Sequence, residues 1–261
     1  MQLFNGDSSI ILKDLPDNSV DMVLTSPPYD DLRNYNNSCT FNFEVFKVIA
    51  DELYRVLTDG GVVVWVVGDK TEDGSESCTS FKQALYFKEI GFKLHDTMIY
   101  QKSNYVPLSH NRYEQEFEYM FCFSKGKPKT FNPIKIPCKY AGQETWGSPS
   151  VYKTDSDELT KIGKTVIGDY KIHGNIFPYK VGSITESSKY HHPAMFPMDL
   201  AVDQIKSWSN KGDTVLDPFM GSGTTGVATL KLGREFIGIE LEEGYFNMSK
   251  DRLNAVPHRL F

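Results

Sequence analysis

Residues 25–29, Thr-Ser-Pro-Pro-Tyr, have the types and the order needed to hold a flat group that carries an amine. They follow a strand-like run at 20–24. Two consecutive prolines end a strand, because neither donates a ladder hydrogen bond and both fix φ. Backbone carbonyls then turn outward beside an aromatic ring, at the strand end where ligands bind in open α/β sheets. The segment predicts a nucleobase site, with an ordinary turn as the alternative when it is taken alone.

A glycine-rich turn follows a second apolar strand in residues 215–226, with the sequence VLDPFMGSGTTG. Gly221 and Gly223 permit positive φ and close approach of a ligand, and with Gly226 they match the dinucleotide fingerprint G-x-G-x-x-G. The next expected strand ends in Glu240, an acid placed to accept hydrogen bonds from ribose hydroxyls. NAD is open as a ligand at this point. A P-loop is excluded, because no Gly-Lys-Ser/Thr follows the glycines.

Taken together, the two motifs resemble those of the amino-methyltransferases that modify exocyclic nitrogens of DNA bases with S-adenosylmethionine. Residues 192–197 (HPAMFP) are similar to the family segment that closes over the methionine half of the cofactor, and 118–126 (EYMFCFSKG) to its late strand. The order, with the catalytic strand first and the cofactor strands last, matches the circularly permuted beta group. The resemblance covers most of the chain outside about 130–190. It implies a Rossmann-like α/β methyltransferase sheet with a reversed last strand.

The resemblance also implies roles for individual residues. The catalytic set is Ser26, Pro27, Pro28 and Tyr29, in which a hydroxyl and a carbonyl accept hydrogen bonds from the amine and the ring stacks on a flipped base. The cofactor set, with Asp7 at the adenine amine, comprises Asp7, Phe196, Asp217, Pro218, Phe219, Gly221, Gly223, Thr224 and Glu240. Neither a metal ion nor a covalent enzyme intermediate is expected.

Residue 26 bears on which base is modified. Adenine-N6 members of the family usually carry Asp or Asn where this chain has Ser26, and the Ser form is found mainly in cytosine-N4 enzymes. A neutral hydroxyl accepts a hydrogen bond without placing a charge near the O2 and N3 acceptors of cytosine. We therefore expect transfer to cytosine N4, with adenine N6 as the alternative.

The 261 residues suit one α/β domain with an insertion. Alternating patterns predict a mostly parallel sheet covered on both faces. The expected strands are 20–24, 62–67, 92–100, 117–124, 214–216 and 235–239, and the expected helices are 43–57, 79–90, 198–208, 225–232 and 242–253. Strands 92–100 and 117–124 are expected to form an antiparallel hairpin. We divide the chain into a catalytic half (1–126), a target-recognition insertion (127–190) and a cofactor-binding half (191–261).

The insertion differs from the rest in charge. From 125 to 190 there are eleven lysines against six acids, whereas the whole chain has a net charge of −6. Binding to DNA depends on the local field near the phosphates, so a net acidic chain is compatible with it. Candidate phosphate contacts are Lys125, Lys127 and Lys129, and candidate contacts to base edges are His173, Asn175, Tyr179 and Gln143. A solvated lysine-rich loop is the alternative.

Double-stranded DNA is the expected partner, together with a restriction endonuclease acting on the same site; a monomer and a homodimer are both left open. No apolar run is long enough to span a bilayer, no secretory signal is visible, and the four cysteines form no close pair. These features predict a cytoplasmic protein of bacterial, archaeal or phage origin. Methyltransferases acting on protein or RNA, and a nicotinamide-dependent oxidoreductase, are the competing functions.

Overall fold

The computed structural model describes residues 1–28, 41–104, 112–146, 164–180 and 197–257. The chain divides into two compact units: one comprises Met1–Asn132 with Asn175–Phe261, and the other comprises Pro133–Gly174. The smaller unit lies within the predicted insertion 127–190. Both ends of that insertion belong to the larger unit, so the compact unit is shorter than the predicted one.

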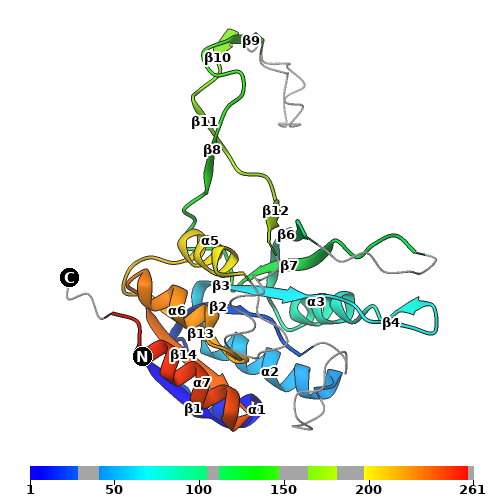
Figure 1. Ribbon diagram of the computed structural model, residues 1–261, viewed down its shortest axis with the longest axis vertical. Helices are drawn as coiled ribbons and strands as arrows, with labels where there is room; N and C mark the ends of the chain where they lie inside the picture. Colours follow the sequence, from blue (N-terminus) through cyan, green and yellow to red (C-terminus); the bar gives the residue numbers. More distant parts are fainter. Residues whose placement is uncertain (29–40, 105–111, 147–163, 181–196, 258–261) are drawn as a thin grey trace. The chain divides into compact units, whose positions relative to one another are not determined.

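The larger unit is built on an eight-stranded sheet in the order β1-β14-β13-β2-β3-β7-β6-β12 (Figure 1). The strands, in sheet order, are β1 (Gln2–Asn5), β14 (Glu235–Glu240), β13 (Thr214–Asp217), β2 (Val20–Thr25), β3 (Leu57–Val67), β7 (Phe117–Ser124), β6 (Lys93–Lys102) and β12 (Ile176–Tyr179). Strand β7 runs antiparallel to both of its neighbours, and the other pairings are parallel. The reversed strand and the 92–100/117–124 hairpin predicted from the sequence are confirmed.

The first strand of the chain pairs with the last, since β1 lies parallel to β14 with Asn5 opposite Glu240. This brings the segment before Asp7 beside the strands near the other end of the sequence. Asp7 and Glu240, which the resemblance assigns to the same cofactor, are therefore carried by neighbouring strand ends.

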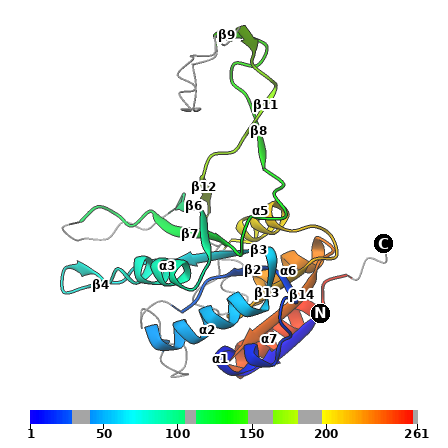
Figure 2. The same ribbon diagram turned by 180° about the vertical axis from the view of Figure 1, so that it is seen from behind.

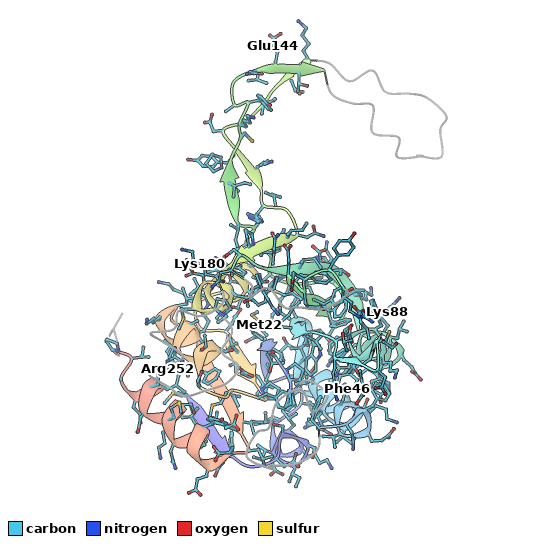
Figure 3. All side chains as sticks on the ribbon, turned by 45° about the vertical axis from the view of Figure 1, so that its right-hand side comes forward. Met22, Phe46, Lys88, Glu144, Lys180 and Arg252 are labelled. Atoms are coloured by element: carbon cyan, nitrogen blue, oxygen red, sulfur yellow. The ribbon has the colours of Figure 1, made fainter. Side chains whose placement is uncertain are left out.

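Helices cover both faces of the sheet (Figures 1 and 2). On one face are α1 (Ser8–Ile11), the 3-10 turn η1 (Leu12–Asp14), α2 (Phe43–Val56) and α3 (Thr79–Glu89); on the other are α5 (Met198–Trp208), α6 (Thr224–Lys231) and α7 (Glu243–Asn254). Met22 and Phe46, labelled in Figure 3, belong to the separate cores on the two faces.

Helix α2 shows how the sequence produces this packing. Its buried residues Phe46, Ile49, Ala50, Leu53 and Val56 recur at three- and four-residue spacing, which places them on one stripe. The side chain of the preceding asparagine accepts a hydrogen bond from a first-turn backbone N–H and so fixes where the helix begins.

Strand β12 is an element that the sequence patterns did not indicate. Residues Ile176–Tyr179 pair in parallel with Ile99–Lys102 of β6 and extend the main sheet at its edge. A short hairpin of β4 (Thr71–Glu72) and β5 (Ser75–Glu76) also precedes α3.

The smaller unit is a ribbon made from short antiparallel pairs. Strand β8 (Lys135–Pro137) pairs with β11 (Tyr170–Ile172), and β9 (Glu144–Trp146) pairs with β10 (Lys164–Val166). None of its described residues with an assigned exposure is buried. The unit therefore presents side chains to solvent instead of enclosing a core in its described part.

Candidate active site at the carboxyl ends of the parallel strands

The chemistry-bearing motifs meet at one edge of the sheet. Strand β2 ends at Thr25, β13 at Asp217 and β14 at Glu240, and these three strands are parallel neighbours. Carboxyl ends of parallel strands lie at the same edge, which is where ligands bind in open α/β sheets. The topology therefore joins segments that are some 190 residues apart in the chain.

Ser26, Pro27 and Pro28 follow directly after β2. Thr25 is the last β2 residue paired with β3, opposite Trp65. Ser26 and Pro28 are partly buried and Pro27 is buried, so the segment leaves the sheet at its surface with one side against the protein. Tyr29 lies outside the described residues.

Asp217 is buried and connects the two motifs. Its Oδ1 accepts a hydrogen bond of 2.7 Å from the Thr25 hydroxyl and one of 3.1 Å from the Phe219 backbone N–H. Burial raises the pKa of the Asp217 carboxyl from 3.8 to about 6, although the hydrogen bonds from Thr25, Thr225 and Phe219 oppose this rise.

The glycine turn after Asp217 has the backbone that the sequence predicts. Gly221 and Gly223 have φ of 48° and 79°, in the region that favours glycine. A Cβ on Gly226 would lie 2.6 Å from Leu253 Cδ2, so this glycine lets α6 pack closely against α7. The three glycines thus serve turn geometry and close packing, as in a nucleotide-binding turn.

Glu240 closes the other side of this turn. Its Oε2 accepts a 2.9 Å hydrogen bond from the Gly221 N–H, and its Oε1 accepts one of 2.9 Å from the Glu242 N–H. Burial raises the pKa of Glu240, partly offset by these two backbone bonds. A carboxylate has about four lone-pair positions, so each oxygen retains an acceptor direction beyond its backbone bond. These remaining acceptor positions fit the hydroxyl donors of the ribose of a nucleoside cofactor.

Asp7 lies beside Glu240. The backbone N–H of Gly6 donates a 2.9 Å hydrogen bond to the Glu240 carbonyl, and the Ser8 hydroxyl donates to the Pro218 carbonyl. The Oδ1 atom of Asp7 caps α1 by accepting from the Ser9 backbone and hydroxyl at 2.8 and 2.7 Å. The structure therefore assembles Asp7, Pro218 and Glu240 at one edge.

The aromatic residues of the predicted cofactor set differ in what the structure shows. Phe219 is partly buried and packs edge-on against Phe41 and Trp65, with ring centroids 5.4 and 6.3 Å apart. It therefore belongs in part to the core beneath the turn. Phe196 lies outside the described residues, as does the 192–196 part of the segment predicted to close over the cofactor.

Sequence reasoning assigned no role to two residues of this site. Thr25 opens the 25–29 segment, but its part in the site is visible only when Asp217 is placed beside it. Arg252, in α7, donates through Nη1 to the Ser222 carbonyl at 2.9 Å and to the Thr224 hydroxyl at 3.2 Å, and so holds the glycine turn from outside (Figure 3). Neither position carries a local signal, because each acts through a partner distant in sequence.

Two of the predicted phosphate contacts lie at the opposite edge. The backbone of Lys125 pairs with Gly61 near the start of the buried part of β3, and the Lys129 ammonium contacts Asp21 Oδ1 at 2.5 Å near the start of β2. The Lys125 ammonium donates to the Asn18 side chain and the Leu57 carbonyl at 2.9 and 2.8 Å. Both lysines thus stabilise the amino-end edge of the sheet. Lys127, between them, is exposed.

The residues predicted to contact base edges fall in different units of the structure. The Tyr179 side chain is buried and its hydroxyl donates to Asp203 at 2.9 Å, so the suggestion that Tyr179 touches base edges is wrong. The Asn175 amide donates to the Thr97 carbonyl at 3.1 Å. His173 belongs to the smaller unit, where its backbone N–H donates to Ile134. Gln143, also in that unit, is exposed.

Among the described residues, no group of three or more His, Cys, Asp or Glu side chains is arranged to hold a metal ion. None of the described helices has both the length and the apolar composition needed to cross a membrane.

Comparison with known proteins decides the family. A family model described as DNA methylase matches residues 20–251. The chain belongs to the DNA methylase family. It is 47% identical over 245 residues to a protein named orphan methyltransferase M.BamHII from Bacillus amyloliquefaciens, covering 92% of this chain and 91% of that one.

Solved structures agree with the fold. The crystal structure of the M1.HpyAVI–SAM complex matches with 27% sequence identity and a TM-score of 0.65. The match covers 97% of this chain and 98% of that one. The PvuII DNA methyltransferase, described as cytosine-N4-specific, matches with a TM-score of 0.67 at 20% identity. This match covers 99% of this chain and 87% of that one. The chain is thus a DNA methyltransferase of the N4-cytosine and N6-adenine family, which uses S-adenosylmethionine. The circular permutation of its sheet stays a prediction.

Proposed function

We propose that this protein is a sequence-specific methyltransferase that transfers a methyl group from S-adenosylmethionine to the exocyclic N4 of a cytosine flipped out of duplex DNA. The observation that carries the proposal is the junction of the two motifs. Ser26 and Pro27 leave β2 at the same edge as the glycine turn, and the Thr25–Asp217 hydrogen bond of 2.7 Å ties them together.

The cofactor would lie across this edge. Glu240 would accept from the ribose hydroxyls, and Asp7, whose capping bonds use only Oδ1, would accept from the adenine amine through Oδ2. Gly221, Gly223 and Thr224 would border the methionine half. Asp217, Pro218 and Phe219 would support the turn, with Phe196 packed near the adenine or methionine portion.

The bound cofactor supplies an activated methyl group on a sulfonium, so the task of the protein is mainly positioning. The difficulty lies in the amine, whose lone pair is delocalised into the base. The Ser26 hydroxyl and the Pro27 carbonyl would accept hydrogen bonds from the amine hydrogens, which favours a pyramidal nitrogen with more available electron density. Pro28 holds the segment extended, and Tyr29 would stack on the flipped base, a contact worth roughly 1–3 kcal/mol.

Support for cytosine over adenine comes from residue 26. A neutral hydroxyl at this position avoids a negative charge beside the ring acceptors of cytosine. Asp or Asn, usual in the adenine-N6 members that this chain resembles, is absent there. Adenine N6 is the alternative, with the same mechanism.

Recognition of duplex DNA is assigned to the smaller unit and its flanks. A two-stranded ribbon fits the major groove of B-DNA. The described ribbon exposes Lys135, Lys139 and Lys171 together with Tyr170, which is 65% exposed. Lysines would contact phosphates, as would exposed Lys127, and His173 would reach base edges. Lys125, Lys129 and Asn175 are left out of this contact set because their side chains are engaged within the larger unit.

The test is to express the protein in a host that lacks DNA methylation and to map modified bases in the chromosome. N4-methylcytosine at one recurring sequence is the expected result, and loss of it in Ser26→Ala assigns it to this site. N6-methyladenine instead would overturn the cytosine assignment. An absence of any modified base, with S-adenosylmethionine bound to the purified protein, would overturn DNA as the substrate.

The proposal includes a restriction endonuclease that cuts at the same sequence. The relative from Bacillus amyloliquefaciens bears the name orphan methyltransferase, which counts against a dedicated partner there. Once the methylated sequence is mapped, resistance of that DNA to endonucleases cutting at it measures the protective role directly.

A further inference from the structure

The pairing between β2 and β13 ends before the strands do. The backbone register joins Val215 to Met22 and Leu216 to Val23. Strand β13 continues to Asp217 and β2 to Thr25. At the edge where the site lies, the two strands are joined by side chains beyond this register.

The main side-chain link is the hydrogen bond from the Thr25 hydroxyl to Asp217 Oδ1, 2.7 Å long. The same oxygen accepts a hydrogen bond of 3.1 Å from the backbone N–H of Phe219, which lies at the start of the glycine turn. Thr25 is 0% exposed and Asp217 is 2% exposed, so water has no access to replace the bond. One carboxylate oxygen thus holds both the residue before Ser26 and the start of the glycine turn.

We propose that Thr25 is a positioning residue that fixes Ser26 relative to the cofactor turn. It reaches neither base nor cofactor, and it acts through Asp217 on one side and through its chain neighbour Ser26 on the other. Occupation of the turn by the cofactor then stabilises the segment that holds the amine. This inference rests on the proposed function, since it concerns the geometry of methyl transfer.

The variants follow from the side-chain shape. Thr25→Val keeps the volume and removes the hydroxyl, and Thr25→Ser keeps the hydroxyl. Thr229→Val is the matched control: Thr229 is also 0% exposed, and among the described residues its hydroxyl has no hydrogen-bond partner. A buried Thr→Val change is thus made once with and once without loss of a hydrogen bond.

The first readout separates binding from transfer. With saturating labelled S-adenosylmethionine and unmodified genomic DNA, Thr25→Val should slow the first turnover roughly tenfold, the size expected for losing one hydrogen bond to a buried charged group. The dissociation constant for S-adenosylmethionine should change by less than about threefold, because the Phe219–Asp217 bond that starts the turn remains. Thr25→Ser should restore the rate, and Thr229→Val should leave it unchanged.

The second readout needs no DNA. In the wild-type protein, S-adenosylmethionine should slow hydrogen exchange of the peptide covering residues 20–26, and Thr25→Val should lose this slowing. Failure of the wild type to bind S-adenosylmethionine, or to methylate DNA, would defeat the proposed function. The positioning role is overturned if bound cofactor leaves exchange of 20–26 unchanged, or if Thr25→Ser is as slow as Thr25→Val. It is also overturned if rate and affinity fall together with the melting temperature.

Discussion

Replacing Asp217 with asparagine should change how the stability of the protein depends on pH. The carboxyl is buried, and its pKa is raised from 3.8 to about 6. When a carboxyl has a higher pKa in the folded than in the unfolded state, its contribution to the free energy of unfolding is greatest at pH values below the unfolded pKa. This contribution is lost as pH rises through the folded pKa. At 1.36 kcal/mol per pKa unit, the full loss is about 3 kcal/mol.

The asparagine side chain removes the titration and keeps most of the contacts. Its Oδ1 can still accept from Thr25 and from the Phe219 N–H, while its amide can donate to the Thr225 hydroxyl. Any cost of these changes is the same at every pH. The ionisable neighbour is Glu240, whose pKa is raised chiefly by burial and in a smaller part by the charge on Asp217. Removing that charge lowers the pKa of Glu240, which also reduces the stability lost as pH rises. Its effect on the variant therefore has the same sign as the loss of the Asp217 carboxyl.

Urea unfolding of both proteins between pH 5 and pH 8 measures this. About half of the loss, roughly 1.5 kcal/mol, falls in that interval, so the variant should gain this much relative to the wild type as pH rises. Asp14→Asn, at an exposed position, is the matched control for the removal of one carboxylate. A curve for Asp217→Asn that runs parallel to the wild type would show that the carboxyl is not penalised by burial, and the reasoning would fail.

Other substitutions test the roles assigned to the site. Tyr29→Ala should slow methyl transfer roughly tenfold or more with cofactor affinity retained, whereas Gly223→Val should abolish cofactor binding, because its φ is 79°. If both variants lose only cofactor affinity in titrations, the assignment of these roles is wrong. Gly226→Ala places a Cβ 2.6 Å from Leu253 Cδ2 and should cost about 1–3 kcal/mol in urea unfolding, with unchanged stability contradicting the close packing. Arg252→Gln should weaken S-adenosylmethionine binding roughly tenfold by calorimetry, because a hydrogen bond to the glycine turn is lost, and Arg252→Lys should weaken it less. Equal affinity in the wild type and both variants would show that Arg252 does not hold the turn in place for the cofactor.

The sequence by itself determined the local parts of the site. A strand followed by two prolines, or by a turn with glycines at fixed spacing, is defined by residues that neighbour each other in the chain. The positive φ values of Gly221 and Gly223 were predictable for this reason, and so, to within one residue, were the places where β2, β13 and β14 end. The hairpin of β6 with the reversed strand β7 was predictable too, because no helical pattern separates the two apolar runs.

The tertiary structure alone decided what lies beside what. Lys125 and Lys129 follow β7, and because β7 runs antiparallel to β3 they emerge at the edge away from the site. A lysine-rich composition gives charge but no direction, so the sequence placed them with the DNA contacts. Tyr179 was misplaced for a related reason: β12 is short, and only its pairing with β6 shows that the residue is buried.

The bond between Thr25 and Asp217 shows the difference most clearly. Both residues belong to motifs that stand out in the sequence, Thr25 to 25–29 and Asp217 to 215–226. The strands that carry them become neighbours only when β13 enters the sheet beside β2, although the two residues are 192 positions apart in the chain. A contact of this kind depends on strand order, which local patterns leave undetermined because they specify what each strand is and not which strand it joins.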